Sequence, residues 1–322
     1  MRILLLGKGG QVGWELQRSL SVLGQVMALD FDTTEVDGVP VCGDFSQPER
    51  VAQTVRDLKP DVIVNAAAHT AVDKAQSEPD VARLLNATTP GLVAQEAKKL
   101  GAWLMHYSTD YVFDGSGTTP WVETDAPSPL NVYGHTKLEG EQAIVQSGCQ
   151  HIILRTSWVY GARGGNFAKT MLKLAQEREE LKVINDQVGA PTGADLLADV
   201  TAHIIARCRA NAAAHARLNT HANGGASADP QTFSGIYHCA AAGQTTWFDY
   251  ANHVLSSAVA INPAIKIRAK VLPVPTSAFP TPAQRPHNSR LNSTKLQHTF
   301  GLNLPHWQAG VSRMLTEFLD KS

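Results

Sequence analysis

Residues 1–13 of this chain read MRILLLGKGGQVG, and this stretch decides the fold. The apolar run Arg2–Leu6 predicts a β-strand, and a helical pattern follows the glycines without a break. The spacing is Gly7-x-x-Gly10-x-x-Gly13. The first glycine allows a tight turn, the second the close approach of a pyrophosphate, and the third close packing of helix on strand. Free N–H groups at the helix N-terminus would face the phosphates. The stretch therefore predicts a dinucleotide-binding unit.

The composition excludes several classes of protein. The 322 residues carry 28 basic and 29 acidic side chains, which removes the electrostatic signature of a nucleic-acid or acidic-lipid binder. No apolar run in the sequence approaches the ~18–20 residues of a membrane span. The four cysteines (Cys42, Cys149, Cys208 and Cys239) show no paired spacing and are typical of reduced thiols, without a disulfide frame or zinc site. We expect a cytoplasmic protein with no nucleic-acid or membrane partner.

Short apolar runs alternate with helical patterns through the first half of the chain. The runs predicted as strands are Arg2–Leu6, Val26–Leu29, Asp61–Asn65, Trp103–Ser108 and His151–Arg155. The helices expected between them cover Val12–Leu23, Pro48–Leu58, Pro79–Leu100 and Val132–Gln146. Pro90 should kink the third of these helices or divide it. Strict alternation implies right-handed crossovers, so the expected fold class is α/β, with a Rossmann-like, doubly wound parallel sheet.

Beyond Tyr160 the alternation loosens. Longer loops join the helices expected at Asn166–Glu179, Ala194–Cys208, Trp247–Val259 and Trp307–Leu319. We expect an NAD(P)-binding Rossmann domain over residues 1–160, and a smaller C-terminal domain over residues 161–322 that is mainly substrate-binding. Some C-terminal segments should return to the Rossmann sheet.

Two irregular stretches lie in the second half. Residues 209–235, rich in Ala, His, Asn and Gly, are typical of a surface-loop insertion. Their histidines, His215 and His221, do not indicate a metal, because no carboxylate or cysteine joins them at ligand spacing. The proline-dense stretch Pro273–Pro286 should be stiff and extended. It leads into the polar run Arg285–Arg290, at a place where a substrate loop could lie.

Residues near the ends of the next apolar stretches bear on the choice of cofactor. Asp30 ends the second predicted strand, 17 residues after Gly13, where a carboxylate would bond the ribose hydroxyls and favour NADH. The alternative is that Asp30 is a plain loop residue. Lys8, within the glycine loop, could tolerate a 2′-phosphate, and Asp44 and Phe45 are placed to flank the adenine. The expected cofactor is therefore NADPH or NADH.

A Tyr-x-x-x-Lys pair, Tyr133 and Lys137, lies in the helix predicted after the fourth strand. Residues four apart share a helix face, so the ammonium should lie beside the phenol and lower its pKa from a reference of about 10. The fourth strand ends in Tyr107-Ser-Thr109-Asp110, which places a hydroxyl at the carboxyl edge of the sheet, where ligands bind. The phenol can give a proton to a carbonyl oxygen that Thr109 orients, while hydride arrives from nicotinamide. Tyr133, Lys137 and Thr109 are the catalytic candidates.

Together the glycine loop, the hydroxyl at the end of the fourth strand and the Tyr-x-x-x-Lys pair resemble the extended branch of the short-chain dehydrogenase/reductase superfamily. Six further stretches narrow the resemblance to the dTDP-4-dehydrorhamnose reductase family: Asn65–Asp73, His106–Phe113, Asn131–Gly134, Arg155–Tyr160, Asn185–Thr192 and Arg285–Asn292. The resemblance covers nearly the whole chain, with residues 209–235 as the exception.

The resemblance implies reduction of the C4 ketone of dTDP-4-dehydro-β-L-rhamnose to dTDP-β-L-rhamnose, in the synthesis of a sugar donor for bacterial surface polysaccharide such as O-antigen. It implies that Tyr133 donates the proton. The residues that it assigns to the cofactor are Gly7, Gly10, Gln11, Val12, Gly13, Asp30, Asp44, Phe45, Ala68, His69, Thr70, Tyr107, Tyr133 and Lys137. Those assigned to the sugar are Thr109, Asp110 and Trp158. An indole just past the fifth strand could also pack on a sugar ring, although a lone tryptophan is more often core.

Relatives of this kind can bridge a homodimer with a magnesium ion held by three carboxylates. In this chain Glu15 is retained, Asp195 is a shorter acid, and Thr294 stands at the third position. The loss of a carboxylate weakens a site for a hard cation, so we expect no bound magnesium. Whether the chain forms a homodimer stays open.

Two other functions stay open as well. A nucleotide-sugar dehydratase or epimerase of the same superfamily would share the fold, but dehydratases follow the threonine with an Asp-Glu pair, and here Tyr111 follows Asp110. A non-catalytic NADP-binding regulatory subunit would share the glycine loop, but Thr109, Tyr133 and Lys137 are all present.

Overall fold

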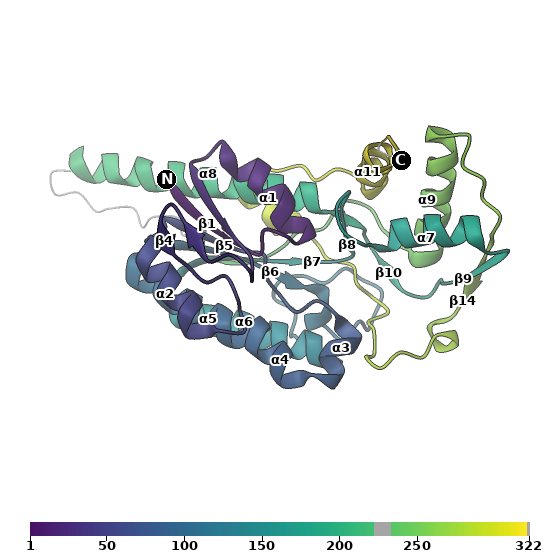
Figure 1. Ribbon diagram of the computed structural model, residues 1–322, viewed down its shortest axis with the longest axis horizontal. Helices are drawn as coiled ribbons and strands as arrows, with labels where there is room; N and C mark the ends of the chain where they lie inside the picture. The colour runs from purple at the N-terminus through teal and green to yellow at the C-terminus, as the bar shows by residue number, and fades with distance from the viewer. Residues whose placement is uncertain (222–232, 321–322) are drawn as a thin grey trace.

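The computed structural model describes residues 1–221 and 233–320, with the backbone alone over residues 213–221. Its centre is a six-stranded sheet in which every neighbouring pair is parallel, in the order β12-β7-β6-β5-β1-β2 (Figure 1). The strands are β1 (Arg2–Leu6), β2 (Gln25–Leu29), β5 (Val62–Asn65), β6 (Trp103–Thr109), β7 (Gln150–Thr156) and β12 (Gly235–His238). Successive strands are added on one side of β1 and then on the other, so the doubly wound α/β fold is confirmed.

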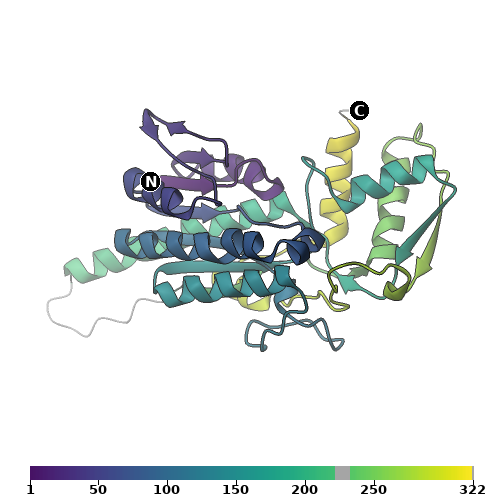
Figure 2. The same cartoon turned by 60° about the horizontal axis from the view of Figure 1, so that its bottom comes forward.

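Helices cover both faces of this sheet (Figures 1 and 2). On one face pack α1 (Gln11–Ser21) and α8 (Ala194–His221), and on the other α2 (Pro48–Leu58), α5 (Thr89–Leu100) and α6 (Val132–Ser147). The burial of strand β1 on both faces explains why its sequence is continuously apolar. Ile3 and Leu5 join the first core, Leu4 and Leu6 join the second, and all four are fully buried.

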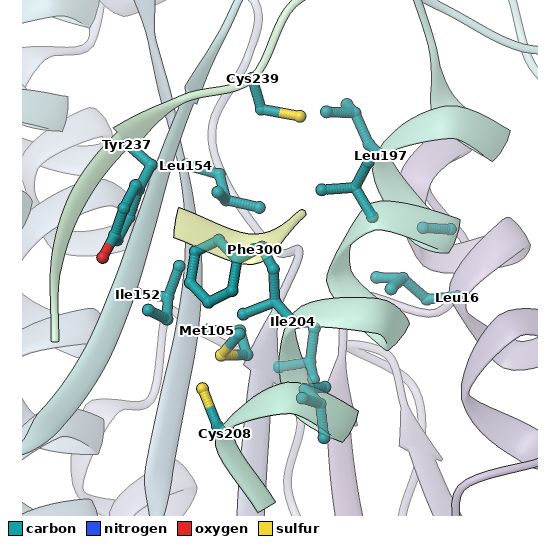
Figure 3. Packing of buried hydrophobic residues seen from close by; sticks show 14 of the residues in the cluster. Leu16, Met105, Ile152, Leu154, Leu197, Ile204, Cys208, Tyr237, Cys239 and Phe300 are labelled. Atoms are coloured by element: carbon teal, nitrogen blue, oxygen red, sulfur yellow. The ribbon is translucent and has the colours of Figure 1, made fainter. Parts of the chain in front are cut away.

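The core between the sheet and α8 is drawn in Figure 3. Leu16 of α1 and Leu197 of α8 meet Ile152 of β7 and Phe300 of α10 (Thr294–Phe300). The Phe300 ring also packs on Tyr237 of β12, with the ring centroids 5.2 Å apart. Each such buried side chain contributes roughly 1.5–3 kcal/mol. This packing holds β12 in the sheet although it lies far from β7 in the sequence.

The third predicted helix is divided, as expected, but just before Pro90. α4 (Pro79–Arg83) passes through a π-helical turn, Leu84–Thr88, into α5. Pro90 lies in the first turn of α5, where a missing N–H is tolerated. The π turn places Asn86 in a fully buried position, and such turns are frequent at functional sites.

A second group of elements carries a core of its own. Helices α7 (Phe167–Glu177), α9 (Trp247–Ile261) and α11 (Trp307–Leu319) pack with the parallel pair β9 (Glu180–Ile184) and β14 (Lys270–Val274), at the right of Figure 1. Pro273 lies in β14, which pairs with β9 in a two-stranded sheet, and an edge strand tolerates the missing N–H. The proline-dense stretch thus begins as a strand.

The remaining elements are short. They are β3 (Glu35–Val36), β4 (Val39–Pro40), α3 (Val72–Ser77), the 3₁₀ turns Asp110–Val112 and Thr276–Ala278, β8 (Val159–Tyr160), β10 (Val188–Gly189), β11 (Thr192–Gly193) and β13 (Thr245–Thr246). Within the described residues, none of the helices combines the length and the apolar character needed to cross a membrane.

The prediction of a loop insertion over residues 209–235 is wrong in its first half. Helix α8 continues to His221, because the run Asn211-Ala-Ala-Ala-His215-Ala has high helix propensity. The predicted helix end at Cys208 is therefore too early. Residues 222–232 lie outside the described residues, as do the side chains of the two histidines, and Gly235 already begins β12.

Candidate active site

The glycine loop between β1 and α1 has the shape of a phosphate cradle. The N–H of Gly7 donates to the carbonyl of Leu29 at 2.9 Å, which ties the loop to β2. Gly7 has a φ of +85°, and a Cβ at Gly13 would lie 1.9 Å from the Gly7 carbonyl oxygen, so both positions require glycine. Helix α1 begins at Gln11, and its N-cap, Gly10, supplies no side-chain cap. The first-turn N–H groups can therefore serve a ligand.

The first two residues of α1 have different surroundings. Val12 packs against the core between the sheet and α8. The Gln11 side chain accepts a hydrogen bond from the Asn166 amide at 3.4 Å. Asn166 in turn caps α7 by accepting from the Lys169 N–H at 3.1 Å. Gln11 thus joins the glycine loop to the second group of elements.

Asp30 follows β2 and contacts the glycine loop directly. Its carboxylate accepts from the Gly9 N–H at 2.7 Å and from the Phe31 N–H at 3.0 Å. The side chain is only partly buried, so it can hold the loop and still meet a ribose hydroxyl. The neighbouring Phe31 is 74% exposed and offers an apolar surface at the same edge.

Asp44 and Phe45 precede α2. The Asp44 carboxylate accepts from the Gln47 amide at 2.6 Å and from the Ser46 hydroxyl at 2.7 Å, and these bonds hold its pKa below the usual value. The Phe45 ring is buried in the core beneath α2. Any contact between Phe45 and an adenine would therefore come from its backbone.

The loop Ala66–Thr70, which follows β5, lies against the glycine loop. A Cβ at Gly7 would lie 2.7 Å from the Ala67 nitrogen. Asn86 holds this loop at His69: its Oδ1 accepts from the His69 N–H at 2.8 Å and its Nδ2 donates to the His69 carbonyl at 3.1 Å. The buried His69 Nδ1 has no hydrogen-bond partner among the described residues. An orphaned nitrogen beside the phosphate cradle fits a dinucleotide with polar groups at this place.

Thr109 and Tyr133 meet at the carboxyl end of β6. Thr109 ends the strand, and Tyr133 lies in the first turn of α6, whose N-cap Asn131 accepts from the Gly134 N–H at 2.9 Å. The Thr109 hydroxyl is near enough to the Tyr133 hydroxyl to lower the pKa of that phenol in part. A Cβ at Gly134 would lie 2.1 Å from the Tyr111 carbonyl oxygen, so this glycine lets α6 approach the turn after β6. The two hydroxyls converge where one carbonyl oxygen could meet both.

Lys137 lies one turn further along α6 and is 2% exposed. Its Nζ donates to the Tyr107 carbonyl oxygen at 2.6 Å and lies 3.1 Å from Nε2 of His106. Burial lowers the pKa of Lys137 to about 8, and the Glu141 carboxylate raises it in part.

The Tyr107 hydroxyl is bonded to the Thr201 hydroxyl of α8 at 2.6 Å, so that side chain faces the opposite side of the sheet.

The structure contradicts the expected lowering of the Tyr133 pKa. Burial raises the pKa of Tyr133 to about 12, and the hydrogen bond with Thr109 lowers it in part. The reason is burial of the phenol, and Lys137 does not offset it in this structure, where the nitrogen of Lys137 contacts His106 and the Tyr107 carbonyl. At neutral pH Tyr133 is a protonated phenol, which is the form that a proton donor needs.

Asp110 is a buried carboxyl beside these hydroxyls, and it is 2% exposed. Burial raises its pKa to about 7, while hydrogen bonds with Ser289 and Thr109 lower it in part. Its Oδ2 has no hydrogen-bond partner in the part of the chain that the structure describes. A buried polar atom left open in this way is suited to anchor a ligand.

A cavity of about 360 Å³ opens beside the site. It is lined by Tyr111, whose ring meets that of Tyr133 edge-on at 5.5 Å, and by the indoles of Trp158 and Trp247, which stack with centroids 3.6 Å apart. Trp158 has a φ of +49°, which is rare for a bulky residue and occurs at ligand sites. The volume suits a small-molecule ligand.

Arg285, from the predicted substrate loop, lines the same cavity. Its guanidinium forms a two-point ion pair with Asp73 of α3, at 2.9 and 3.1 Å, which holds the pKa of Asp73 below its usual value. The Ala283 N–H also donates to Asp73 at 3.2 Å. The C-terminal segment is therefore fastened across the cavity to the Rossmann side.

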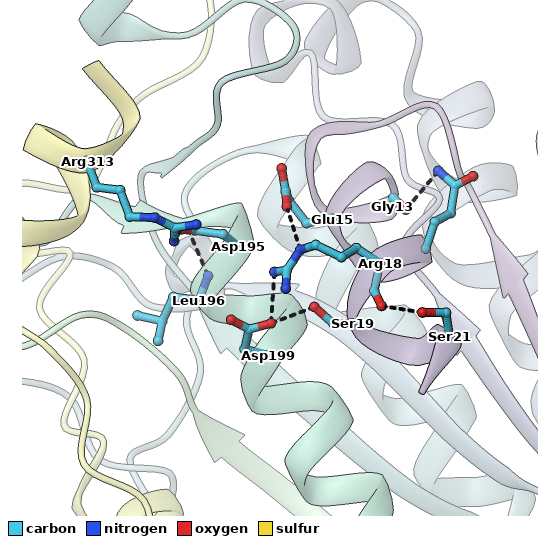
Figure 4. A network of polar contacts seen from close by, with 10 residues as sticks. Gly13, Glu15, Arg18, Ser19, Ser21, Asp195, Leu196, Asp199 and Arg313 are labelled. Carbon is cyan, nitrogen blue, oxygen red and sulfur yellow. Dashed lines mark hydrogen bonds and ion pairs between the residues drawn. The ribbon is translucent and has the colours of Figure 1, made fainter. Parts of the chain in front are cut away.

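The two carboxylates considered for magnesium lie near arginines (Figure 4). Asp195 pairs with Arg313, and Glu15 lies 3.6 Å from Arg18, which also bonds Asp199 at 2.9 Å. Among the side chains that the structure describes, in residues 1–212 and 233–320, no group of three His, Cys, Asp or Glu could hold a metal. Thr294, the third position, begins α10.

Sequence reasoning missed four residues of this site: Phe31, Asn86, His106 and Trp247. Asn86 lies in a π turn, for which the sequence gives no signal beyond the nearby proline. His106 and Tyr107 are consecutive in a buried strand, so their side chains point to opposite faces of the sheet. The strand pattern therefore predicts that one of them faces α6. Trp247 joins Trp158 only through the long-range packing of α9.

The fold and this cluster of hydroxyls and lysine define an oxidoreductase of the extended short-chain dehydrogenase/reductase class. The family described as the RmlD substrate binding domain matches residues 1–320. The chain is 57% identical to a dTDP-4-dehydrorhamnose reductase of Shigella flexneri, over 98% of each chain. It is 44% identical to one of Burkholderia thailandensis, over 100% of each. The chain therefore belongs to the dTDP-4-dehydrorhamnose reductase family.

Solved structures agree with this assignment. The dTDP-4-dehydrorhamnose reductase of Bacillus anthracis, determined in complex with NADP, superposes with a TM-score of 0.82 at 32% identity, over 98% of this chain and 99% of that one. The reductase of Clostridium acetobutylicum gives 0.81 at 34% identity, over 100% and 99%.

Proposed function

We propose that this protein reduces the C4 ketone of dTDP-4-dehydro-β-L-rhamnose to dTDP-β-L-rhamnose, with NADPH or NADH as hydride source, in dTDP-rhamnose and surface polysaccharide biosynthesis. The observation that carries the proposal is the convergence of the Thr109 and Tyr133 hydroxyls beside the indole-lined cavity. The Bacillus anthracis relative with bound NADP supports the cofactor class.

Residues on the Rossmann side would hold the cofactor, which supplies a hydride to the carbonyl carbon when bound. Backbone N–H groups of the glycine loop and of Gln11 and Val12 would bind the pyrophosphate. Asp30 would bond the adenosine ribose, and Asp44 with the Phe45 backbone would flank the adenine. The groups nearer the nicotinamide would be Ala68, His69, Thr70, the Tyr107 backbone, Tyr133 and Lys137.

The chain's own chemistry is the delivery of one proton. As the ketone carbon is reduced, the Tyr133 O–H bond breaks and a new O–H bond forms on the sugar. Thr109 would hydrogen-bond the same oxygen and orient it. Lys137 would stabilise the phenolate that remains, and Asp110 and Trp158 would bind the sugar.

We assign residues 1–160 to the cofactor-binding domain and residues 161–322 mainly to the substrate-binding domain, with β12 returning to the Rossmann sheet. The protein would act in the cytoplasm on a dTDP-sugar, without nucleic acid or membrane, as a monomer or as a homodimer without bridging magnesium. The pairing of Asp195 with Arg313 supports the last point.

The test is to mix purified protein with the keto-sugar nucleotide and NADPH. We expect one NADPH consumed per ketone, and an NMR spectrum of the product with the rhamnose configuration at C4. A dehydratase or epimerase would change the sugar without net consumption of NADPH. A regulatory subunit would bind the cofactor and consume none.

A further inference from the structure

A chain of buried hydrogen bonds runs from the loop after β5 to Lys137. The Ala67 N–H donates to Asn65 Oδ1 at 3.0 Å, and Asn65 Nδ2 lies 3.0 Å from His106 Nδ1. His106 Nε2 lies 3.1 Å from Lys137 Nζ, which bonds the Tyr107 carbonyl oxygen at 2.6 Å. The side-chain members, Asn65, His106 and Lys137, are 1–2% exposed. Water cannot easily replace a partner in such a chain.

The two ends of this chain fix its direction. A backbone N–H can only donate, so the Asn65 amide must place its oxygen toward the Ala67 N–H. The donating Nδ2 of Asn65 then faces His106. His106 Nδ1 then accepts, and the ring proton lies on Nε2, facing Lys137. Lys137 can donate to the Tyr107 carbonyl and also accept from His106 only as a neutral amine, because an ammonium has no lone pair.

We propose that His106 is a positioning residue that, together with Asn65, disfavours the ammonium form of Lys137 and couples its charge to the loop after β5. When Lys137 is protonated, an N–H of its ammonium and the Nε2–H of His106 point at each other. If the ring proton of His106 then moves to Nδ1, it faces the donating Nδ2 of Asn65. Turning the Asn65 amide to relieve this would place Nδ2 against the Ala67 N–H. An unsatisfied buried donor is costly, so charging Lys137 and shifting this loop are linked.

The other groups that face Lys137 leave this argument intact. Glu141, on the same helix, raises the pKa of Lys137, but its carboxylate is held by Arg155 at 2.6 and 2.9 Å, which balances its charge. Tyr133 is a neutral phenol at neutral pH. The π turn packed against α6 contributes Asn86, which is uncharged and bonds the hydroxyl of Thr136, the neighbour of Lys137, at 3.1 Å. Burial lowers the Lys137 pKa to about 8, in the same direction as the proposed effect of His106.

The proposal deepens the proposed reductase function, because a charged Lys137 would stabilise the Tyr133 phenolate. The position of the ring proton, however, can be measured on the full chain without cofactor or substrate. NMR of protein labelled with ¹⁵N-histidine and ¹³Cε-lysine reports both groups. His106 should carry its proton on Nε2 above the Lys137 titration midpoint, near pH 8, and on Nδ1 below it.

Two other histidines, the buried His151 and the exposed His203, calibrate the same spectrum. His203 Nε2 lies 2.8 Å from the Phe300 carbonyl and must be protonated there, whereas His151 Nδ1 lies 2.9 Å from the Cys149 carbonyl and must be protonated at that nitrogen. His106 should match His203 at high pH. If it matches His151 instead, the proposal is overturned, and this result needs no variant.

Variants test the coupling itself. In His106→Phe and His106→Asn the donor to Lys137 is lost, so the acid dissociation constant of Lys137 should fall about tenfold, which is one pKa unit. The control His151→Asn, in the neighbouring strand, should leave it unchanged. An unchanged Lys137 midpoint in both His106 variants would refute the coupling.

Asn65→Asp should reverse the donor and acceptor roles along this chain of hydrogen bonds. A carboxylate accepts at both ends, so it would keep the His106 proton on Nδ1 at every pH and let Nε2 accept from the ammonium. The Lys137 midpoint should rise further than in His106→Phe. The double variant, Asn65→Asp with His106→Phe, retains only the added charge and should show a smaller rise. An equal rise would show that charge alone accounts for the effect.

Activity gives an independent arm. Deprotonation of Lys137 should cause the fall of kcat/KM at alkaline pH. His106→Phe should shift this alkaline limb to higher pH by the same amount as the Lys137 midpoint measured by NMR. His151→Asn should not move it. If the protein reduces no keto-sugar, the proposed function fails while the NMR result stands. If it reduces the sugar and the limb stays in place, the coupling fails alone.

Discussion

The proton-delivering side of the site and its sugar side are built in opposite ways. Thr109, Tyr133 and Lys137 come from β6 and α6, two consecutive major elements, and their partners His106 and Asp110 are buried. Trp158 and Arg285 come from segments far apart in the chain, and an ion pair that is partly open to solvent holds Arg285 in place. The first side is set by local sequence and the second by long-range packing.

This difference predicts different responses to change. Buried hydrogen bonds on the first side fix the reacting groups in advance, which is what transition-state stabilisation requires. On the second side the indole stack and the Asp73–Arg285 pair can adjust around a ligand. Substitutions on the proton side should therefore change kcat, and those on the sugar side mainly KM.

The largest effect should come from Tyr133→Phe, which removes the proton donor and keeps the ring. We expect kcat to fall by about 10²–10⁴, the usual contribution of general acid catalysis, with cofactor affinity unchanged. Steady-state kinetics and NADPH titration measure the two quantities. The matched control is Tyr237→Phe, which removes a buried hydroxyl bonded to the Phe233 carbonyl, away from the site. Near wild-type turnover in Tyr133→Phe would show that the proton comes from another group.

The rigidity of the proton side should depend on the ion pair beneath Lys137. Glu141 and Arg155 are both nearly fully buried and form bonds of 2.9 and 2.6 Å. Glu141→Leu leaves a buried guanidinium unpaired, so the free energy of unfolding should fall by about 3–5 kcal/mol. Urea denaturation measures this loss. Glu139→Leu, also on α6, breaks an exposed pair with Arg83 of α4 and should cost far less. Equal losses would mean that burial is not the cause.

The same contrast explains what the sequence could predict. Five of the six strands of the central sheet are predictable to within a residue or two, because parallel strands buried on both faces give continuous apolar runs. Thr109, Tyr133 and Lys137 follow from a strand end and a four-residue helix spacing. The sixth strand, β12, escaped prediction because Gly235–His238 is short and enters the sheet through packing on Phe300.

The details that failed are those set by the environment of a residue. The Tyr133 pKa was expected to fall because Lys137 shares its helix face, but spacing does not show which partner a buried nitrogen selects. Residues 209–235 were judged by their lack of large apolar side chains, although alanine favours a helix without a core. The Trp158–Trp247 stack joins segments that no local pattern relates.

On the sugar side, Trp247→Leu should act on substrate binding. It removes the indole that stacks on Trp158, so KM for the keto-sugar should rise about tenfold, which corresponds to 1.4 kcal/mol. The kcat and the NADPH affinity should stay within about twofold, since the hydroxyls at Thr109 and Tyr133 are untouched. Trp14→Leu, at an indole that is 46% exposed and outside the cavity, is the control. A fall in kcat without a change in KM would show that the two sides are not separate.

The smallest effect should come from Asp73→Asn, which breaks the pair that joins the two sides. The Asp73 and Arg285 side chains are 41% and 26% exposed, so the pair should contribute only ~0.2–1 kcal/mol to stability. The pKa of Asp73 is lowered in the folded protein, so this contribution is present above the unfolded value of 3.8 and disappears as the pH falls below it. Urea denaturation of the wild type and the variant between pH 7 and pH 3 should show the difference in stability shrinking at the acid end.

The KM of Asp73→Asn should change less than about threefold, because the freed Arg285 still lines the cavity. Glu78→Gln, which breaks an exposed pair with Lys74 within α3 and its C-cap, should leave KM unchanged. A tenfold rise in KM for Asp73→Asn alone would mean that the sugar side is fixed as firmly as the proton side.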